Sequence, residues 1–121
     1  MSAEPDDLLA QQLRALRREY LADSTQRVDE LRHLYVRLAA GDRAALPELR
    51  QGFHRLAGSG GSYGFPSVST RSREGERLAS RLATVDAAIT PADLESLRAA
   101  VDGIALAFAE ALSALNEESL G

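Results

Sequence analysis

The sequence predicts an all-α protein, an up-down antiparallel four-helix bundle with room for a short extra N-terminal helix. Apolar residues recur every three or four positions along almost the whole chain, and no segment shows convincing strand character. The breaks between these runs carry capping and turn residues, so the helices are joined by short connections. Short connections make successive amphipathic helices antiparallel neighbours. The length of 121 residues suits one domain, 1–121, with frayed ends expected at 1–5 and 117–121.

The first forty residues contain one bent helix or two. Pro5 followed by two aspartates predicts a helix start, because acids in the first turn complement the helix dipole. The stretch 23–25 fits either the cap of a second helix or the interior of a continuing one. Gly41 and Asp42 predict where this part ends. Its apolar positions keep the helical spacing throughout: Leu9, Leu13, Leu16, Tyr20, Val28, Leu31, Tyr35 and Leu38.

The remaining chain predicts three more helices. The third has its apolar face at Leu46, Leu49, Phe53 and Leu56, and the fourth runs from about Ser67 to Thr84. Thr90 and Pro91 fit the cap and first residue of the last helix. That helix has the strongest periodic signal in the chain: Leu94, Leu97, Val101, Ile104, Phe108, Ala111 and Leu115.

Composition narrows the function classes. The chain is 45% hydrophobic and 26% charged, as in a folded globular domain, and it has no cysteine for disulfides or thiolate metal sites. No apolar run reaches the roughly 18 residues of a membrane span, so we expect no membrane association and a cytoplasmic location. The net charge of −4 argues against nucleic-acid binding. Residues 43–81 are nevertheless basic, with seven arginines against three acids, and predict either a solvated surface or a collar for an anionic partner.

The stretch FHRLAGSGGSYGF, residues 53–65, is the least ordinary part of the chain. It contains G-x-S-x-G, but a nucleophile elbow needs a preceding strand, and the chain predicts none. The absence of lysine excludes a Walker phosphate loop, and the spacing does not fit a dinucleotide fingerprint. A plain linker does not need the apolar residues found here. The stretch is therefore predicted to be helical, although each glycine costs about 1 kcal/mol relative to alanine.

A helical projection of this stretch isolates His54. The apolar residues cluster on one side, and His54 lies about 120° from their centre, on the exposed flank. Its face is shared by Arg50, Gln51, Ala57, Gly58 and Gly61, so small residues follow the imidazole. An exposed neutral imidazole can act as a nucleophile, and neither a Ser-His-Asp set nor a metal-ligand cluster is evident around it. A reversible phosphoryl acceptor needs the least further machinery. His33, the other histidine, is expected to be an ordinary surface or boundary residue.

The stretch resembles histidine-containing phosphotransfer (HPt) domains of bacterial two-component phosphorelays. Their signature, His-x-Leu-Lys-Gly-Ser-Ser followed by an apolar residue and Gly, is matched by residues 54–60 (HRLAGSG) and 63–65 (YGF). The flanking segments 43–49 and 75–82 fit the same family. The resemblance implies that His54 is the phosphoacceptor and that Gly58 leaves room for a receiver domain.

The resemblance also implies a phosphocarrier without kinase activity of its own. It would take the phosphoryl group from one receiver domain and pass it to another, and the implied partners are response-regulator receiver domains and a hybrid histidine kinase. The chain itself would need no cofactor, because Mg²⁺ is expected on the partner receiver. The resemblance favours a monomer.

One residue departs from the family pattern. The family's lysine, three residues after the histidine, is Ala57 here. Arg50 is the first candidate to support the phosphoryl group instead, ahead of Arg55, Arg71 and Arg73. Gln51 is a candidate hydrogen-bond partner of the ring. The predicted docking surface is Gln51, Arg55, Ala57, Gly58 and Gly61.

Two other functions stay open at this point. One is a docking module of the same fold that binds receiver domains without being phosphorylated. The other is a structural or oligomerisation bundle in which the glycines form a helix-packing seam. An independent enzyme is the least favoured reading, because no second catalytic group can be assigned.

Overall fold

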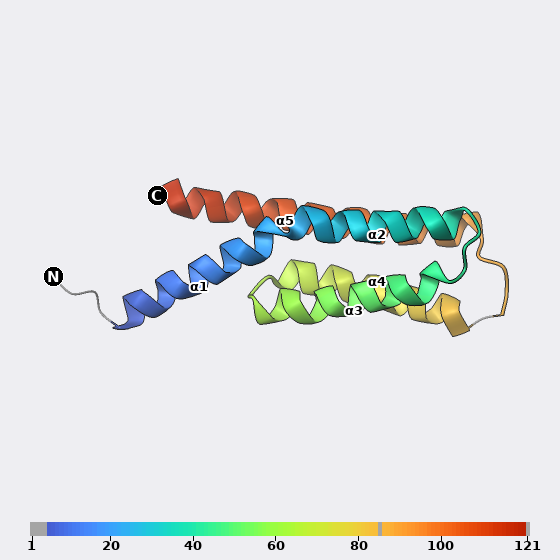
Figure 1. Ribbon diagram of the computed structural model, residues 1–121, viewed down its shortest axis with the longest axis horizontal. Helices are drawn as coiled ribbons and strands as arrows, with labels where there is room; N and C mark the ends of the chain where they lie inside the picture. The colour runs from blue at the N-terminus through green and yellow to red at the C-terminus, as the bar shows by residue number, and fades with distance from the viewer. Residues whose placement is uncertain (1–4, 85, 121) are drawn as a thin grey trace.

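The computed structural model describes residues 5–84 and 86–120, and within them it contains five helices and no strand. In order they are α1 (Pro5–Ala22), α2 (Ser24–Ala39), α3 (Ala45–Ser62), α4 (Pro66–Thr84) and α5 (Pro91–Leu120). Helices α2 to α5 run up and down as an antiparallel four-helix bundle, and α1 leads away from one end of it (Figure 1). The predicted fold class is confirmed, and the extra N-terminal helix has 18 residues.

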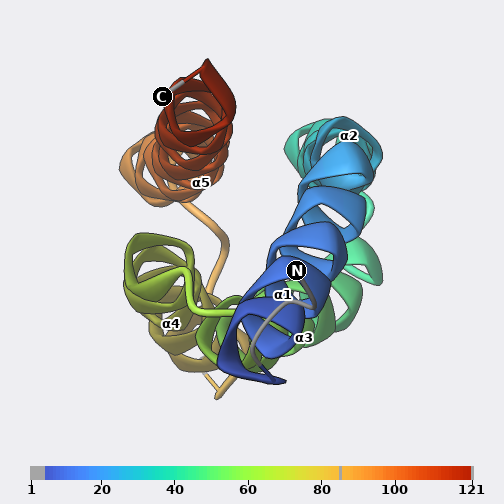
Figure 2. The same ribbon diagram turned by 90° about the vertical axis from the view of Figure 1, so that its left-hand side faces the viewer.

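Each bundle helix packs against two others, α3 against α2 and α4, and α5 against α4 and α2. Figure 2 shows this arrangement nearly end-on. The core is built from the residues of the predicted apolar faces, which the antiparallel packing removes from water. Its most deeply buried large side chains include Leu46, Leu49, Phe53, Val68, Leu97 and Ile104.

Local chemistry explains where the helices end. Gly41 and Gly64 have φ values of +100° and +83°, a conformation that favours glycine. In each turn the residue after the glycine donates to a carbonyl five positions back, Asp42 to Arg37 and Phe65 to Gly60. These are Schellman closures of α2 and α3. Helix α5 begins with the predicted cap.

That cap is reciprocal. The backbone N–H of Asp93 donates to Oγ1 of Thr90 over 3.1 Å, and the N–H of Thr90 donates to the Asp93 carboxylate over 3.0 Å. The backbone hydrogen bond that Thr90 donates to the carboxylate, together with the Thr90 hydroxyl, lowers the pKa of Asp93.

The first forty residues form two helices, which resolves the alternative left open by the sequence. Asp23 is non-helical and gives α2 no side-chain cap. Just before this break, Tyr20 is buried and stacks on Tyr63, with ring centroids 4.5 Å apart. Its hydroxyl lies 2.7 Å from Oγ of Ser59, and burial raises the pKa of this phenol. Tyr20 therefore fixes the end of α1 to the end of α3.

Helix α1 starts at Pro5, and α5 continues to Leu120. The fraying expected at 1–5 and 117–121 stays a prediction, and residues 1–4 and 121 lie outside the described part. Residues 91–118 of α5 satisfy the length and composition criteria for a membrane span, with a mean hydropathy of 1.3. This is weak evidence for a span, because Leu97, Val101 and Ile104 of α5 are buried in the bundle, and core helices meet the same criteria.

Candidate functional site

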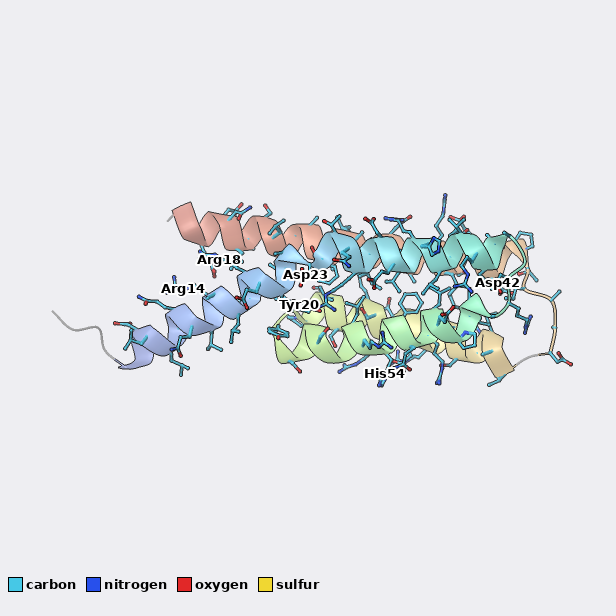
Figure 3. All side chains as sticks on the ribbon, in the orientation of Figure 1. Arg14, Arg18, Tyr20, Asp23, Asp42 and His54 are labelled. Carbon is cyan, nitrogen blue, oxygen red and sulfur yellow. The ribbon has the colours of Figure 1, made fainter. Side chains whose placement is uncertain are left out.

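His54 projects from the middle of α3 away from the bundle core (Figure 3). Its side chain is 66% exposed, which leaves the imidazole open to another molecule. The neighbours that hold α3 in place lie on its other sides, where Phe53 and Leu56 are buried. A side chain that reacts with another protein needs a rigid backbone to hold it and access from solvent, and His54 has both.

Glu76 of α4 holds the ring. Its Oε1 atom lies 2.9 Å from Nδ1 of His54, and the Glu76 side chain is 27% exposed. A carboxylate only accepts hydrogen bonds, so this contact places a proton on Nδ1. In the neutral imidazole the lone pair then belongs to Nε2, and the ring orientation is fixed by the same bond. Glu76 was not predicted as a site residue.

After His54, the exposed surface of α3 carries few side chains. A Cβ placed on Gly58 would meet no atom within 4 Å. Gly58 and Gly61 are both exposed, and they lie one and two helical turns after His54. The open patch next to the ring therefore consists largely of backbone.

Glycines on the other side of α3 have a packing role. A Cβ on Gly60 would lie only 3.0 Å from the backbone nitrogen of Ser69, so α3 and α4 approach closely there. Ser69 also donates a 2.7 Å hydrogen bond from its hydroxyl to the carbonyl of Ala57. This contact fixes the second half of α3 against α4.

A comparison with protein-family models decides the family. The model of the Hpt domain matches residues 15–117, which is most of the chain. The chain belongs to the Hpt domain family. Hpt domains are phosphotransfer modules of two-component signalling that interact with receiver domains, and they are phosphocarriers rather than enzymes. Searches of curated proteins and of solved structures gave no match.

In this Hpt domain, most of the predicted site residues lie on the exposed part of α3. Arg50, Gln51, Arg55, Gly58 and Gly61 are all exposed, as His54 is. Gln51 and Arg55 also line a groove of about 250 Å³ between α2 and α3, together with Arg27, Glu30 and Glu48. The predicted docking residues therefore extend from the glycine patch to this groove.

Two expectations about individual residues are corrected. Ala57 was placed on the face of His54, but its side chain is only 6% exposed because α4 covers this side of α3. Its methyl group therefore contributes almost nothing to an exposed docking surface. Gln51 was the candidate partner of the ring, but Nδ1 of His54 donates its hydrogen bond to the carboxylate of Glu76 on the next helix.

Proposed function

We propose that this Hpt domain is a phosphorelay intermediate that carries a phosphoryl group on His54. The observation that supports this most is the exposed imidazole with Nδ1 bonded to Glu76 and an open glycine surface beyond it. The Glu76 bond leaves Nε2 as the nucleophile, and the glycines leave space for the donor. A surface histidine without a function would need neither a fixed tautomer nor the open glycine surface.

The transfer can be written with this chain's own atoms. Nε2 of His54 attacks the phosphorus of an aspartyl phosphate, so that an N–P bond forms and the P–O bond to the aspartate carboxylate breaks. The free carboxylate leaves with the bonding electron pair, and the ring keeps its proton on Nδ1. The phosphorylated ring thereby gains positive charge, which the Glu76 carboxylate offsets at 2.9 Å from Nδ1. Transfer to a second receiver is the same step in reverse.

The phosphoryl donor and acceptor are aspartates of receiver domains, one in a hybrid histidine kinase and one in a response regulator. Their Mg²⁺ ion belongs to the receiver, and it neutralises phosphoryl charge when the two proteins meet. Such partners place the Hpt domain in the cytoplasm. The receiver docks over Gly58 and Gly61, where an approaching backbone meets no side chain, and over Gln51 and Arg55 beside the α2–α3 groove.

Arg50 is the proposed cation of the chain for the phosphoryl group. It lies one turn before His54 on α3, is exposed, and has no ion-pair partner among the described residues. A guanidinium binds phosphoryl oxygens in a bidentate geometry. If Arg50 has this role, Arg50→Ala lowers the transfer rate by about tenfold, the effect of losing about 1.4 kcal/mol. An unchanged rate would remove Arg50 from the site.

The test is phosphotransfer from phosphorylated receiver domains to the purified protein. We expect an acid-labile, alkali-stable phosphate on the wild type and none on His54→Gln. His33→Gln is the matched control, because His33 is the other histidine and is also exposed. Loss of phosphate in the His33 variant and retention in the His54 variant would contradict the proposal.

A second candidate function is a docking module that binds receivers without accepting phosphate. The observation that favours it is Ala57, which stands where a cation is expected and is buried against α4. In the same assay the wild-type protein would bind receivers but remain unlabelled. The His54→Gln variant would bind receivers as well as the wild type does.

A further inference from the structure

The groove between α2 and α3 is lined by two arginines at the end nearest Gly58. Leu31 of α2 packs onto the backbone of Gly52 of α3, where a Cβ would lie 2.9 Å from Cδ2 of the leucine. The two helices run antiparallel, so the next turn beyond this contact carries Arg27 on α2 and Arg55 on α3, and both line the groove. Since Gly58 follows within about one turn of α3, this basic end of the groove adjoins the glycine patch.

The acidic side chains of the groove form no ion pair with these two arginines. Glu48 lines the other end, and its carboxylate is paired with Arg37 at 2.8 Å. Glu30 also lines the groove, but among the described residues no ion pair joins it to Arg27 or to Arg55. Both guanidinium groups are therefore available to an acid from outside the chain.

Arg27 is held in position by an aromatic ring rather than by an acid. Its Cζ atom lies 5.2 Å from the centre of the Tyr20 ring, and the Tyr20 hydroxyl lies 2.7 Å from Oγ of Ser59. The Nε atom of Arg27 is buried and has no hydrogen-bond partner among the described residues. The guanidinium is therefore fixed before any partner binds, while part of its hydrogen-bonding capacity is unused.

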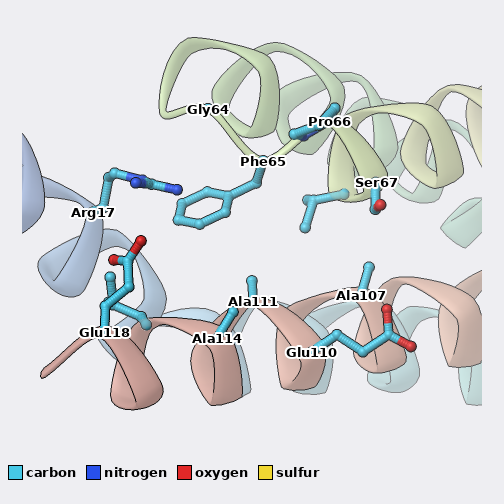
Figure 4. A pocket seen from close by; sticks show the side chains of 12 residues that line it. Arg17, Gly64, Phe65, Pro66, Ser67, Ala107, Glu110, Ala111, Ala114 and Glu118 are labelled. Atoms are coloured by element: carbon cyan, nitrogen blue, oxygen red, sulfur yellow. The ribbon is translucent and has the colours of Figure 1, made fainter. Parts of the chain in front are cut away.

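Arg17 shows that packing on a ring does not by itself create a site for an acid. Its Cζ atom lies 4.9 Å from the centre of the Phe65 ring, and its Nε is likewise buried without a partner in the described part of the chain. The pocket beside it, between the α3–α4 turn and α5, is also lined by Glu110 and Glu118 (Figure 4). These carboxylates would repel an acidic ligand. Arg27 instead shares its end of the groove with a second arginine.

The reactive edge of the His54 ring faces the same flank of α3 as this basic end. Nδ1 is bonded to Glu76 on α4, and Nε2 lies on the opposite edge of the imidazole, so Nε2 points away from α4. Ala57, on the flank of α3 toward α4, is buried, whereas Arg55, on the other flank, lines the groove toward α2. A protein that reaches Nε2 therefore also covers the basic end of the groove.

We propose that Arg27 and Arg55 together bind an acidic side chain of the receiver domain that docks at His54. This inference rests on the proposed function, and it adds Arg27, a residue of a different helix, to the docking surface. A guanidinium accommodates a carboxylate in a bidentate geometry, and one that is fixed in advance loses little freedom on binding. Arg27 is thus a residue for affinity and partner choice, and it does not touch the reacting atoms.

Calorimetric titration of the full chain with an unphosphorylated receiver domain that binds it tests the role of the arginines. We expect Arg27→Gln and Arg55→Gln each to weaken binding by about tenfold. Arg17→Gln is the matched control, because it removes the same charge and the same kind of ring contact outside the groove. It should bind as the wild type does. Unchanged binding by both groove variants overturns the proposal, as does an equal loss with Arg17→Gln.

Urea unfolding of each variant checks that it is folded. Arg55 is exposed, so Arg55→Gln keeps the test decisive even if the loss of the Tyr20 contact unfolds Arg27→Gln.

A double-mutant cycle identifies the acid on the receiver. Each Asp and Glu on the docking face of the receiver is replaced by its amide, and binding to the wild type and to Arg27→Gln is compared. We expect one replacement that weakens binding to the wild type several-fold and leaves binding to Arg27→Gln unchanged. A receiver without such an acid overturns the proposal.

This inference and the proposed function fail in different ways. Labelling of His54 together with unchanged binding by Arg27→Gln and Arg55→Gln overturns the acid site and supports the phosphocarrier. Receiver binding that depends on both arginines, without any labelling of His54, overturns the phosphocarrier and supports the acid site.

Discussion

Gly58 and Gly60 stand two residues apart on α3, and their surroundings are opposite. Gly60 is buried, and a Cβ there would lie 3.0 Å from both the Ser69 backbone nitrogen and Cγ1 of Val68. Gly58 is exposed, and a Cβ there would have no neighbour within 4 Å. Folding accounts for Gly60, because a larger residue would push α4 away. Nothing in the described fold requires Gly58.

Gly58 and Gly60 differ in how the cost of a glycine within a helix is offset. A glycine in a helix interior costs about 1 kcal/mol relative to alanine. At Gly60 the close approach of α3 and α4 offsets this cost through packing. At Gly58 no contact within the described residues offsets it. Under the proposed function, this free surface is the one that a docking receiver needs beside His54.

The largest expected effect is on transfer when the open surface is filled. Gly58→Leu places a side chain where the receiver must approach, and a displacement of about 1 Å between reacting groups can lower a rate about 100-fold. The free energy of unfolding should not fall, since leucine is a better helix former than glycine. Transfer kinetics and urea unfolding of the same preparation measure both. Wild-type transfer by Gly58→Leu would remove the glycine patch from the docking surface.

The buried glycine should behave in the opposite way. Gly60→Ala forces a methyl group against the backbone of α4 and should lower the free energy of unfolding by about 1–3 kcal/mol. Transfer by the fraction that remains folded should stay near the wild-type rate. Gly61→Ala is the control, because its Cβ would lie 3.6 Å from Oγ of Ser69, an ordinary contact. Equal stability of the two variants in urea would show that α3 and α4 have room to separate.

A smaller effect on transfer is expected when the Glu76 carboxylate beside the His54 ring is replaced. Glu76→Gln keeps an oxygen acceptor for Nδ1 but removes the negative charge that offsets the phosphorylated imidazole. We expect transfer to slow by about tenfold, equivalent to about 1.4 kcal/mol. Glu74→Gln is the matched control, since Glu74 lines the groove between α4 and α5. Equal rates for Glu76→Gln and the wild type would mean that the contact only orients the ring.

The helices could be predicted from the sequence because their signals are local. Periodicity located the core faces, and Gly41, Thr90 and Pro91 marked helix ends through capping chemistry that neighbouring residues determine. The break at Asp23 was left open, because residues 23–25 fit a cap and a helix interior equally well, and in the structure Asp23 provides no side-chain cap. The break between α1 and α2 coincides with a tertiary contact instead, because Tyr20 packs against the end of α3.

The site could be predicted only in part because it depends on how α3 and α4 pair. A projection of one helix defines the core side but not the second side that a neighbour covers, and for this reason Ala57 was misplaced. Glu76 and His54 are equally far along the chain from Phe65, so a tight α3–α4 hairpin brings them to the same level. That signal was present, but the facing side of α4 follows only from the structure. The helical projection does separate Gly58, on the face of His54, from Gly60, on the core side, but the closeness of α4 to Gly60 follows only from the structure.

The smallest expected effect measures most directly how the surroundings of Gly58 differ from those of Gly60. Gly58→Ala adds one methyl group in open space on a helix, so it should raise the free energy of unfolding by about 0.5–1 kcal/mol. One methyl group obstructs a receiver far less than leucine, and transfer should fall only a few-fold. Urea unfolding of Gly58→Ala and Gly60→Ala should therefore shift in opposite directions, although both variants make the same chemical change. If Gly58→Ala instead destabilises the protein, the open surface is part of the fold, and the argument that glycine is kept there for a partner fails.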